Sequence, residues 1–181
     1  MTMNLITAAR AWDVYESPIG PLTLATSPHG LSSVSFPGRG PARAWDDRDP
    51  PTLTEARVAL EAYFAGERRS FADLALDLGP SPFERAVWTA LQGIPYGETV
   101  SYGELARRIG RPDRVRAVGA AVGRTPVPIV VPCHRVIGAD GSLTGYGGGL
   151  QRKQALLDLE RRVVAGMAPE PAWAFRQLAL L

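Results

Sequence analysis

Short apolar runs separated by turn residues dominate the first 36 positions of the chain. β-Prone runs lie at 12–16, 22–25 and 31–36 and are separated by the turn sequences SPIGP and SPHG. Three short β-strands are therefore predicted. The next stretch, 37–51, has no periodicity and is rich in Pro, Gly, Arg and Asp, so an exposed loop is expected there.

After this stretch the apolar spacing changes to that of a helix. A helix is predicted over 54–64, with Gly66 as its stop signal. The residues of its apolar face are Ala56, Leu60, Tyr63 and Phe64. Over 71–78 alternation predicts a strand with Leu74, Leu76 and Leu78 on one face. These elements indicate a small mixed α/β unit without a catalytic set, which favours a supporting scaffold.

Another helix is predicted after the turn sequence at 79–82. Ser81 and Glu84 have the spacing of a capping box, and Pro82 would be the first helical residue. The apolar positions at helical spacing are Phe83, Val87, Ala90 and Leu91. The turn at 93–97 ends the pattern.

Two short helices with the outline of a helix-turn-helix follow. Ser101 and Glu104 form a second capping box, and the helix that they open would stop at Gly110. A further helix is expected from near Asp113 to about Gly123. Many small helical proteins contain such a pair without binding DNA, so the pattern alone leaves its role open.

The second helix of this pair carries unusually small side chains. After Arg114 and Arg116 it continues as Ala-Val-Gly-Ala-Ala-Val-Gly over 117–123. A helix this bare can approach even a minor groove, about 6 Å wide, if the groove opens. Small residues also permit tight packing against a neighbouring loop. Both interpretations are open at this point.

Length and composition limit the classes of protein to consider. The 181 residues, 45% of them hydrophobic, suffice for one domain or two small ones, and the turn at 79–82 divides them into expected domains 1–80 and 81–181. No run reaches the about 18 apolar residues of a membrane helix. No secretory signal is visible in the first 13 residues, and the single cysteine excludes an internal disulfide, so a cytoplasmic protein is expected. One cysteine and two histidines are too few for a Cys/His zinc site, so no metal is expected.

Charge is unevenly distributed along the chain. The formal net charge is only +2, but residues 1–80 carry seven basic and ten acidic side chains, whereas 81–181 carry thirteen and eight. Within 107–124 there are six arginines against Asp113 alone. This asymmetry favours a polyanionic partner. A solvated basic face is the alternative interpretation.

The single cysteine lies in a proline-rich segment, 126–138. Its three prolines fix φ and remove backbone donors, so a rigid extended segment is predicted, neither helix nor central strand. Cys133 is followed by His134, and a basic neighbour can lower the pKa of a thiol and favour the nucleophilic thiolate. An inert buried cysteine is the alternative.

A glycine-rich segment and a last helix follow the cysteine. Six glycines and Tyr146 lie within 138–149, where backbone N–H groups can approach a flat ligand, although the pattern of a phosphate loop is absent. A helix is predicted over 151–162. Its core-facing residues are Leu156, Leu157 and Leu159. Glu160, near its end, is either a solvated carboxylate or a partner that orients an imidazole.

Four sequence blocks resemble the methylated-DNA–protein-cysteine methyltransferases, the O6-alkylguanine-DNA alkyltransferases. They are IPYGETVSYGELA (94–106), RAVG (116–119), VPCHRVIG (131–138) and LTGYGGG (143–149). The resemblance is dense over 81–165 and extends to SPIGPLTL at 17–24. It implies an α+β fold: a small N-terminal α/β domain, ribonuclease-H-like, and a mostly helical C-terminal domain with a winged-helix-like helix-turn-helix.

The resemblance implies DNA repair by direct damage reversal. Cys133 would accept an alkyl group from O6 of guanine, or less readily from O4 of thymine, and each molecule would act once. His134 would relay the thiol proton through a bound water, and Glu160 would orient the imidazole. The substrate-binding residues that it implies are Tyr102, Val136, Tyr146, Gly147 and Gly148. It implies no cofactor.

The resemblance also implies binding in the minor groove, with the target base flipped out of the duplex. Arg116 resembles the arginine finger of the family, which fills the space that the flipped base leaves in the base stack. The other DNA-binding residues implied are Arg114, Arg124, Ala117, Gly119 and Ala120. The expected partner is double-stranded DNA containing O6-alkylguanine, and the expected protein is a monomer with no membrane association and no obligate protein partner.

Two positions depart from the family pattern. Thr125, the expected structural hinge, stands where many members have an Asn that joins the recognition helix to the active-site loop, and our hypothesis is a lower rate. Gly147 stands where some members have Ser, and our hypothesis is a wider pocket that admits larger O6-alkyl groups.

Three other functions are alternatives. A noncatalytic alkyltransferase-like protein would bind lesions, but those proteins replace the cysteine. A helix-turn-helix transcription regulator would dimerise and read the major groove with polar side chains, of which the Ala/Gly face supplies few. A cysteine hydrolase would need turnover and an oxyanion hole.

Overall fold

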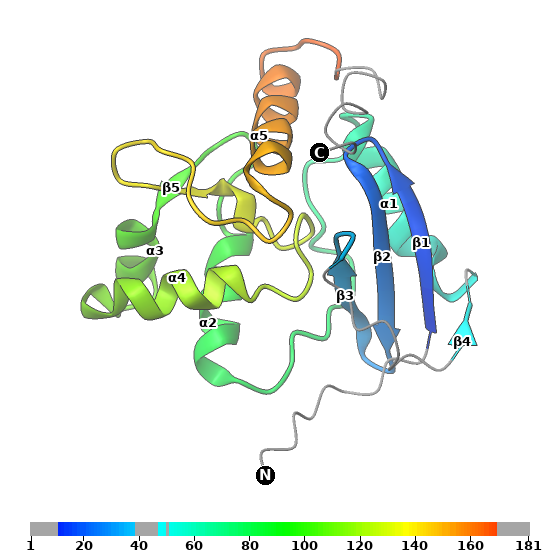
Figure 1. The fold of residues 1–181 in the computed structure, drawn as a ribbon, viewed down its shortest axis with the longest axis horizontal. Coiled ribbons are helices and arrows are strands. Elements are labelled where there is room, and N and C mark those ends of the chain that lie inside the picture. Colours follow the sequence, from blue (N-terminus) through cyan, green and yellow to red (C-terminus); the bar gives the residue numbers. More distant parts are fainter. Residues whose placement is uncertain (1–10, 39–46, 50, 170–181) are drawn as a thin grey trace.

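The N-terminal half is built around a four-stranded sheet with the strand order β3-β2-β1-β4 (Figure 1). The computed structural model describes residues 11–38, 47–49 and 51–169. The strands are β1 (Ala11–Ser17), β2 (Gly20–Ser27), β3 (Gly30–Ser35) and β4 (Asp47–Arg48). β1 and β3 each pair antiparallel with β2, and β4 runs parallel to β1. The three predicted strands are confirmed.

The expected loop at 37–51 is wrong at its C-terminal end. Residues 39–46 and 50 lie outside the described part of the chain. Asp47–Arg48 extends the sheet, and Pro51–Leu53 forms a 3₁₀ turn, η1. Leu53, the last residue of this turn, is buried.

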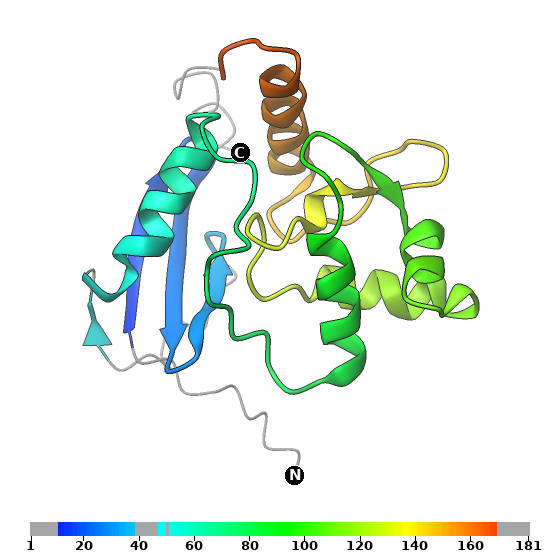
Figure 2. The ribbon, with the colours of Figure 1, turned by 180° about the vertical axis from the view of Figure 1, so that it is seen from behind.

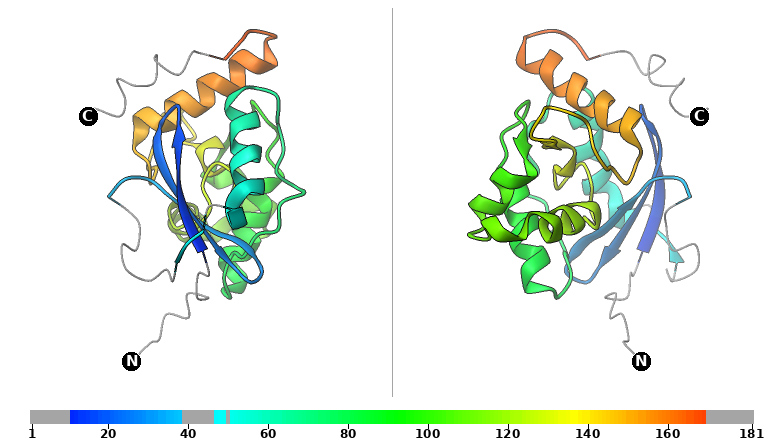
Figure 3. Two further views of the ribbon diagram at one scale, coloured as in Figure 1. Left: turned by 90° about the vertical axis from the view of Figure 1, so that its right-hand side faces the viewer. Right: turned by 60° about the vertical axis from the view of Figure 1, so that its left-hand side comes forward.

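One helix, α1 (Thr54–Phe64), covers a face of the sheet (Figure 3). Its bounds are those predicted. The buried residues are Ala56, Ala59, Leu60, Tyr63 and Phe64. Gly66 follows the helix with φ of 76°, a left-handed conformation that glycine adopts without steric penalty, and its amide donates to the carbonyl of Tyr63.

The predicted strand at 71–78 is wrong. The segment touches β3 through a single isolated bridge, between Leu31 and Leu76, and then leaves the sheet. Leu31 donates to the carbonyl of Ala75 and accepts from the amide of Asp77. The alternation of apolar and polar residues therefore arose because one side of an extended segment is buried, and the segment is not a strand of the sheet. This part of the chain passes between the two halves of the molecule on its way to α2 (Figure 2).

The C-terminal half is mostly helical. It contains α2 (Pro82–Gln92), α3 (Tyr102–Arg108), the 3₁₀ turn η2 (Pro112–Arg114), α4 (Val115–Gly123) and α5 (Leu150–Val164). Both predicted caps are present: Ser81 Oγ accepts from the amide of Glu84 at 3.4 Å, and Ser101 Oγ accepts from the amide of Glu104 at 3.1 Å. The helices that the sequence predicted are therefore confirmed.

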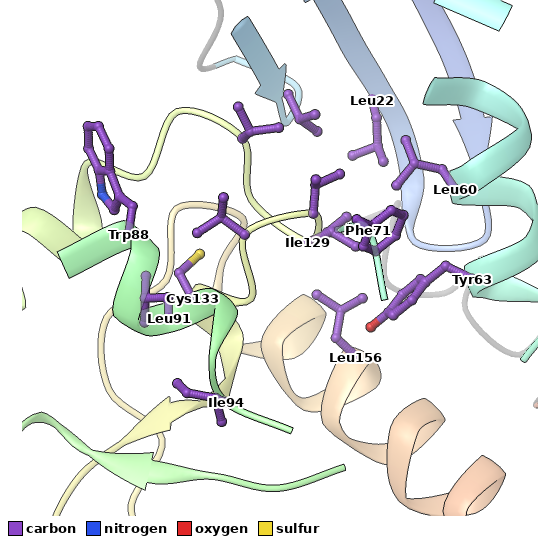
Figure 4. Packing of buried hydrophobic residues seen from close by; sticks show 14 of the residues in the cluster. Leu22, Leu60, Tyr63, Phe71, Trp88, Leu91, Ile94, Ile129, Cys133 and Leu156 are labelled. Atoms are coloured by element: carbon purple, nitrogen blue, oxygen red, sulfur yellow. The ribbon is translucent and has the colours of Figure 1, made fainter. Parts of the chain in front are cut away.

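The two halves share one hydrophobic core. Tyr63 of α1, Ile129 of the proline-rich segment and Leu156 of α5 belong to the same cluster of buried residues (Figure 4). A backbone hydrogen bond of 2.9 Å from Val34 to the carbonyl of Pro126 adds a polar link between them. The site residues on α5 are consequently held by packing from both halves. No helix in the described ranges is long and apolar enough to cross a membrane.

Candidate active site

Cys133 opens a short 3₁₀ turn, η3 (Cys133–Arg135), rather than lying in a purely extended segment. The segment continues into β6 (Val136–Ile137), which pairs parallel with β5 (Val100–Ser101). Ile129 has φ of 76°, which is rare for a β-branched residue, and its side chain is fully buried. Prolines and this strained turn together fix the backbone around the cysteine.

The Cys133 side chain is buried among apolar neighbours, including Leu91 and Ile129 (Figure 4). Burial raises the pKa of the thiol to about 11, although the Thr125 hydroxyl and the charge of Lys153 oppose that rise. The resting group is therefore a thiol, and a nearby base has to take its proton before the sulfur can act as a strong nucleophile.

Glu160 is fully buried at the centre of a hydrogen-bond network. Its Oε1 accepts from His134 Nε2 at 2.8 Å, and the amide of Gly97 donates to Oε2 at 2.9 Å. Arg135 binds both oxygens, with Nη2 2.9 Å from Oε1 and Nε 2.9 Å from Oε2. Of the two roles left open by the sequence, a solvated carboxylate is wrong: Glu160 holds the imidazole.

The charges of this network settle its protonation at neutral pH. Burial alone would raise the pKa of Glu160, but His134 and Arg135 outweigh it and hold that pKa well below its ordinary value. Burial lowers the pKa of His134, so the imidazole is neutral. Since an ionised carboxylate only accepts, Nε2 carries the proton, and the buried Nδ1 has its lone pair available and no protein partner in the described chain. His134 can therefore accept one proton.

Lys153 is a component of the site that the sequence analysis missed. Its side chain is fully buried on α5, and Nζ donates to the carbonyls of Val136 at 2.6 Å and Thr144 at 2.7 Å. Burial lowers its pKa to about 8, partly opposed by Cys133. It is the only lysine beside 19 arginines, and that contrast was the available signal. The carbonyl of Val136, a predicted substrate contact, thus already accepts one hydrogen bond.

Phe36 and Arg152 hold the glycine-rich wall in place. The Phe36 ring packs edge-on against the Tyr146 ring, with the two ring centroids 5.5 Å apart. Phe36 also lies close to Gly148, and a Cβ added to that glycine would be 2.8 Å from the nearest atom of the Phe36 ring. Arg152 stacks on Phe36 and donates to the carbonyl of Gly148 at 2.9 Å. The Tyr146 hydroxyl is buried without a protein partner in the described ranges. Of the predicted wall residues, Gly147 is half-buried and Gly148 buried.

Tyr102 joins the helix pair to this wall. It is the first residue of α3. Its hydroxyl donates to the carbonyl of Thr144 at 3.4 Å and accepts from the Thr144 hydroxyl at 3.3 Å. An added Cβ on Gly119 of α4 would lie 3.6 Å from the Tyr102 ring, which is ordinary contact. Tyr102 thus lies between the small-residue helix and the glycine-rich segment.

The small residues on the outer face of α4 are not buried in a helix–helix contact. Ala117 and Ala120 are exposed and Gly119 is half-buried. The core side of the helix consists of Val118, Ala121 and Val122, and the Ala121 carbonyl accepts from the Trp88 indole of α2. The bare face therefore remains accessible, which favours close approach to a ligand over tight packing.

The three predicted DNA-binding arginines have different surroundings. Arg114 and Arg116 are exposed and form no ion pair within the described ranges. Arg124 binds Glu84 of α2 at 2.6 Å, so part of its charge is used within the fold. Thr125 is half-buried, and its hydroxyl donates to the carbonyl of Val122 at 2.8 Å, which ties the start of the proline-rich segment to α4.

Two family models match the chain. Residues 82–162 match the 6-O-methylguanine DNA methyltransferase DNA-binding domain, and residues 11–78 match the ribonuclease-like domain of the same proteins. Among residues 11–38, 47–49 and 51–169, no group of three or more His, Cys, Asp or Glu residues could hold a metal ion.

Similar proteins carry names of the same kind. A methylated-DNA–protein-cysteine methyltransferase of Mycolicibacterium paratuberculosis is 56% identical over 81% of this chain and 90% of its own length. One of Methanosarcina acetivorans is 50% identical over 81% of this chain and 96% of its own. The crystal structure of Mycobacterium tuberculosis OGT in complex with DNA has a TM-score of 0.82 and 48% identity, covering 93% of this chain and 99% of that one. None of these names describes a transcription regulator or a hydrolase.

Proposed function

The chain belongs to the family of methylated-DNA–protein-cysteine methyltransferases, and we propose that Cys133 is the residue that accepts the alkyl group in its repair reaction. The protein repairs DNA by direct reversal, moving an alkyl group from a damaged base to a cysteine. Cys133 is the only cysteine in the chain. The observation that carries the assignment is its place one residue before His134, whose imidazole is held by buried Glu160 at 2.8 Å.

The transfer is a displacement at the alkyl carbon. As the S–C bond forms and the C–O6 bond breaks, the bonding electrons pass to the guanine. His134 takes the thiol proton at Nδ1 through a bridging water, and a proton returns to the guanine, so the products are S-alkylcysteine and unmodified guanine. Glu160 keeps the imidazole in the tautomer that can accept. Water does not hydrolyse the thioether back to a free thiol, so each molecule reacts once.

The walls around Cys133 suit a flipped purine. Tyr102 would hydrogen-bond the base, the backbone near Val136 would accept from its amino group, and Tyr146 with Gly147 and Gly148 would line the alkyl side. The half-buried Gly147 offers only its backbone there, which supports the hypothesis of a pocket open to larger alkyl groups. O6-Alkylguanine is the substrate that this arrangement favours, with O4-alkylthymine a poorer one.

DNA binding is assigned to the exposed face of α4. Ala117, Gly119 and Ala120 would lie against the minor groove, Arg116 would fill the vacated stack, and Arg114 would contact phosphate. Arg124 would contribute less because of its bond to Glu84. We further propose that the protein acts as a monomer, with domain 81–181 carrying the chemistry and domain 1–80 supporting it.

Intact-mass measurement on a duplex containing one O6-methylguanine tests the proposal. We expect one added methyl group per protein molecule, located on Cys133, with no second addition in excess DNA. Cys133→Ser should bind the duplex and gain no mass. Arg116→Ala should weaken binding to lesion-bearing and undamaged duplexes more than Arg124→Ala does. A wild-type protein that gains no methyl group at stoichiometric excess would overturn the assignment.

A further inference from the structure

Tyr63 brings a hydroxyl group from the N-terminal half into the network around Glu160. It lies in the last turn of α1, and its hydroxyl donates to Glu160 Oε1 at 2.8 Å across 97 positions of sequence. The same oxygen accepts from His134 Nε2 at 2.8 Å. Both Tyr63 and Glu160 are fully buried. The half of the chain in which the sequence shows no catalytic set therefore contacts the carboxylate that holds the imidazole.

The Tyr63 hydroxyl is a fixed donor at every working pH. Burial, and then the charge of Glu160, raise its pKa well above the ordinary value, so the phenol keeps its proton. The ring is enclosed by three aromatic side chains at centroid distances of 5.3 to 5.9 Å, those of Phe64, Phe71 and Tyr96. Figure 4 shows the ring extending from α1 with its oxygen directed towards α5.

We propose that Tyr63 is a positioning residue for alkyl transfer: its hydroxyl holds Glu160 Oε1 in place and shares its negative charge, and so limits how basic His134 becomes. This inference rests on the proposed function of Cys133, His134 and Glu160. Three donors, the Tyr63 hydroxyl, His134 Nε2 and Arg135 Nη2, share the electron density of this one oxygen. Without the phenol, more of that density falls on the imidazole N–H, and the carboxylate loses one of its anchors.

The other charges near this pair remain when the hydroxyl is removed. Arg135 and the amide of Gly97 still hold Glu160, the Tyr96 ring stays against Tyr63, and Lys153 on α5 still disfavours protonation of His134. The net result is a more basic His134 in a less rigid orientation. The acid limb of the rate profile then moves to higher pH, because a protonated imidazole cannot accept the thiol proton.

Tyr63→Phe tests this inference in the full-length protein, because it keeps the ring and removes only the oxygen. We expect single-turnover transfer from an O6-methylguanine duplex to fall about fivefold near neutral pH and further in acid, with the acid limb displaced by about half a pH unit. Tyr15→Phe is the matched control: Tyr15 is a buried tyrosine of β1 whose ring also packs on Phe64. It should leave the rate and its pH profile unchanged.

A double variant separates positioning from simple packing. In a Glu160→Gln background, Tyr63→Phe should change the rate by less than about twofold, because the two residues act on His134 through one contact. A Tyr63→Phe protein that is less stable but has the wild-type pH profile would overturn the inference. The final mass of methylated Cys133 should be the same in Tyr63→Phe and wild type. Failure of wild type to gain that mass would instead defeat the proposed function.

Discussion

Arg135 and Glu160 form a two-pronged ion pair inside the core, with Nε to Oε2 and Nη2 to Oε1 both at 2.9 Å. Arg135 also donates to the carbonyl of Ile94 at 2.6 Å and lies over the Tyr96 ring. The arginine thereby compensates a carboxylate that would otherwise be a lone charge in an apolar interior. The pair joins the turn that carries Cys133 to α5.

Removing this arginine should destabilise the fold strongly. We expect Arg135→Met to lower the free energy of unfolding by about 3–5 kcal/mol, because it leaves the Glu160 carboxylate buried without its counter-charge. Urea unfolding followed by tryptophan fluorescence measures the change. Arg161→Met is the control, since that arginine is exposed and its contact with Asp158 is at 3.4 Å, and it should change stability by less than about 1 kcal/mol. Equal effects of the two substitutions would contradict this account.

Acid should destabilise the protein in two stages. His134 is neutral in the fold with its pKa lowered from 6.5, so the unfolded chain binds an additional proton below that pH and stability declines. The pKa of Glu160 is also lowered, from 4.5, and the stability that its ionised form provides is lost as the pH falls below that value. The urea midpoint measured from about pH 8 to about pH 3 should therefore fall in both windows. His134→Gln should remove the upper decline only; a wild-type midpoint that is flat down to about pH 5 would contradict the first stage.

The buried thiol should react differently with a small reagent and with DNA. With a pKa of about 11, about one molecule in ten thousand is a thiolate at neutral pH, so alkylation by iodoacetamide should accelerate about tenfold per pH unit. Transfer from O6-methylguanine should change less than about threefold from about pH 7 to about pH 9, because neutral His134 takes the proton during the reaction. Rates from intact mass compare the two, with Cys133→Ser as the blank. Parallel profiles would exclude the relay.

Gly148 should tolerate no side chain while Phe36 is present. A Cβ at this position would lie 2.8–2.9 Å from three atoms of the Phe36 ring. We expect Gly148→Ala to lower the free energy of unfolding by about 1–3 kcal/mol and to slow transfer from O6-methylguanine, because the wall with Tyr146 has to shift. Gly123→Ala, where the added carbon meets open space, is the control.

A second substitution checks the cause. Phe36→Leu should restore part of the transfer rate in the Gly148→Ala background, since the smaller side chain vacates the space that the new methyl group needs. If the double variant is as slow as Gly148→Ala alone, the clash with Phe36 is not what displaces the wall.

Local signals in the sequence determined the secondary structure of most of the chain and indicated the residues to which we assign the reaction. Helix-capping signals act within a few residues, so they can be recognised from the sequence alone; examples are Ser81, Ser101 and the stop at Gly66. The Cys133-His134 block and the six-glycine segment are likewise contiguous. Apolar alternation at 71–78 misled because it reports one-sided burial and cannot distinguish a ladder strand from an extended segment that touches a sheet once.

Only the tertiary structure decided what surrounds the Cys133 sulfur. Tyr63, Arg135 and Lys153 look in the sequence like a core aromatic and two ordinary cations, and Glu160 is 26 positions from the histidine that it binds. Their roles arise because burial removes water and leaves each charge dependent on a few fixed partners contributed by distant elements. Sequence spacing carries no record of such contacts. The residues that we propose for alkyl acceptance therefore lie in one contiguous sequence block. The charged and hydrogen-bonding partners around them come together only when the two halves of the chain pack against each other.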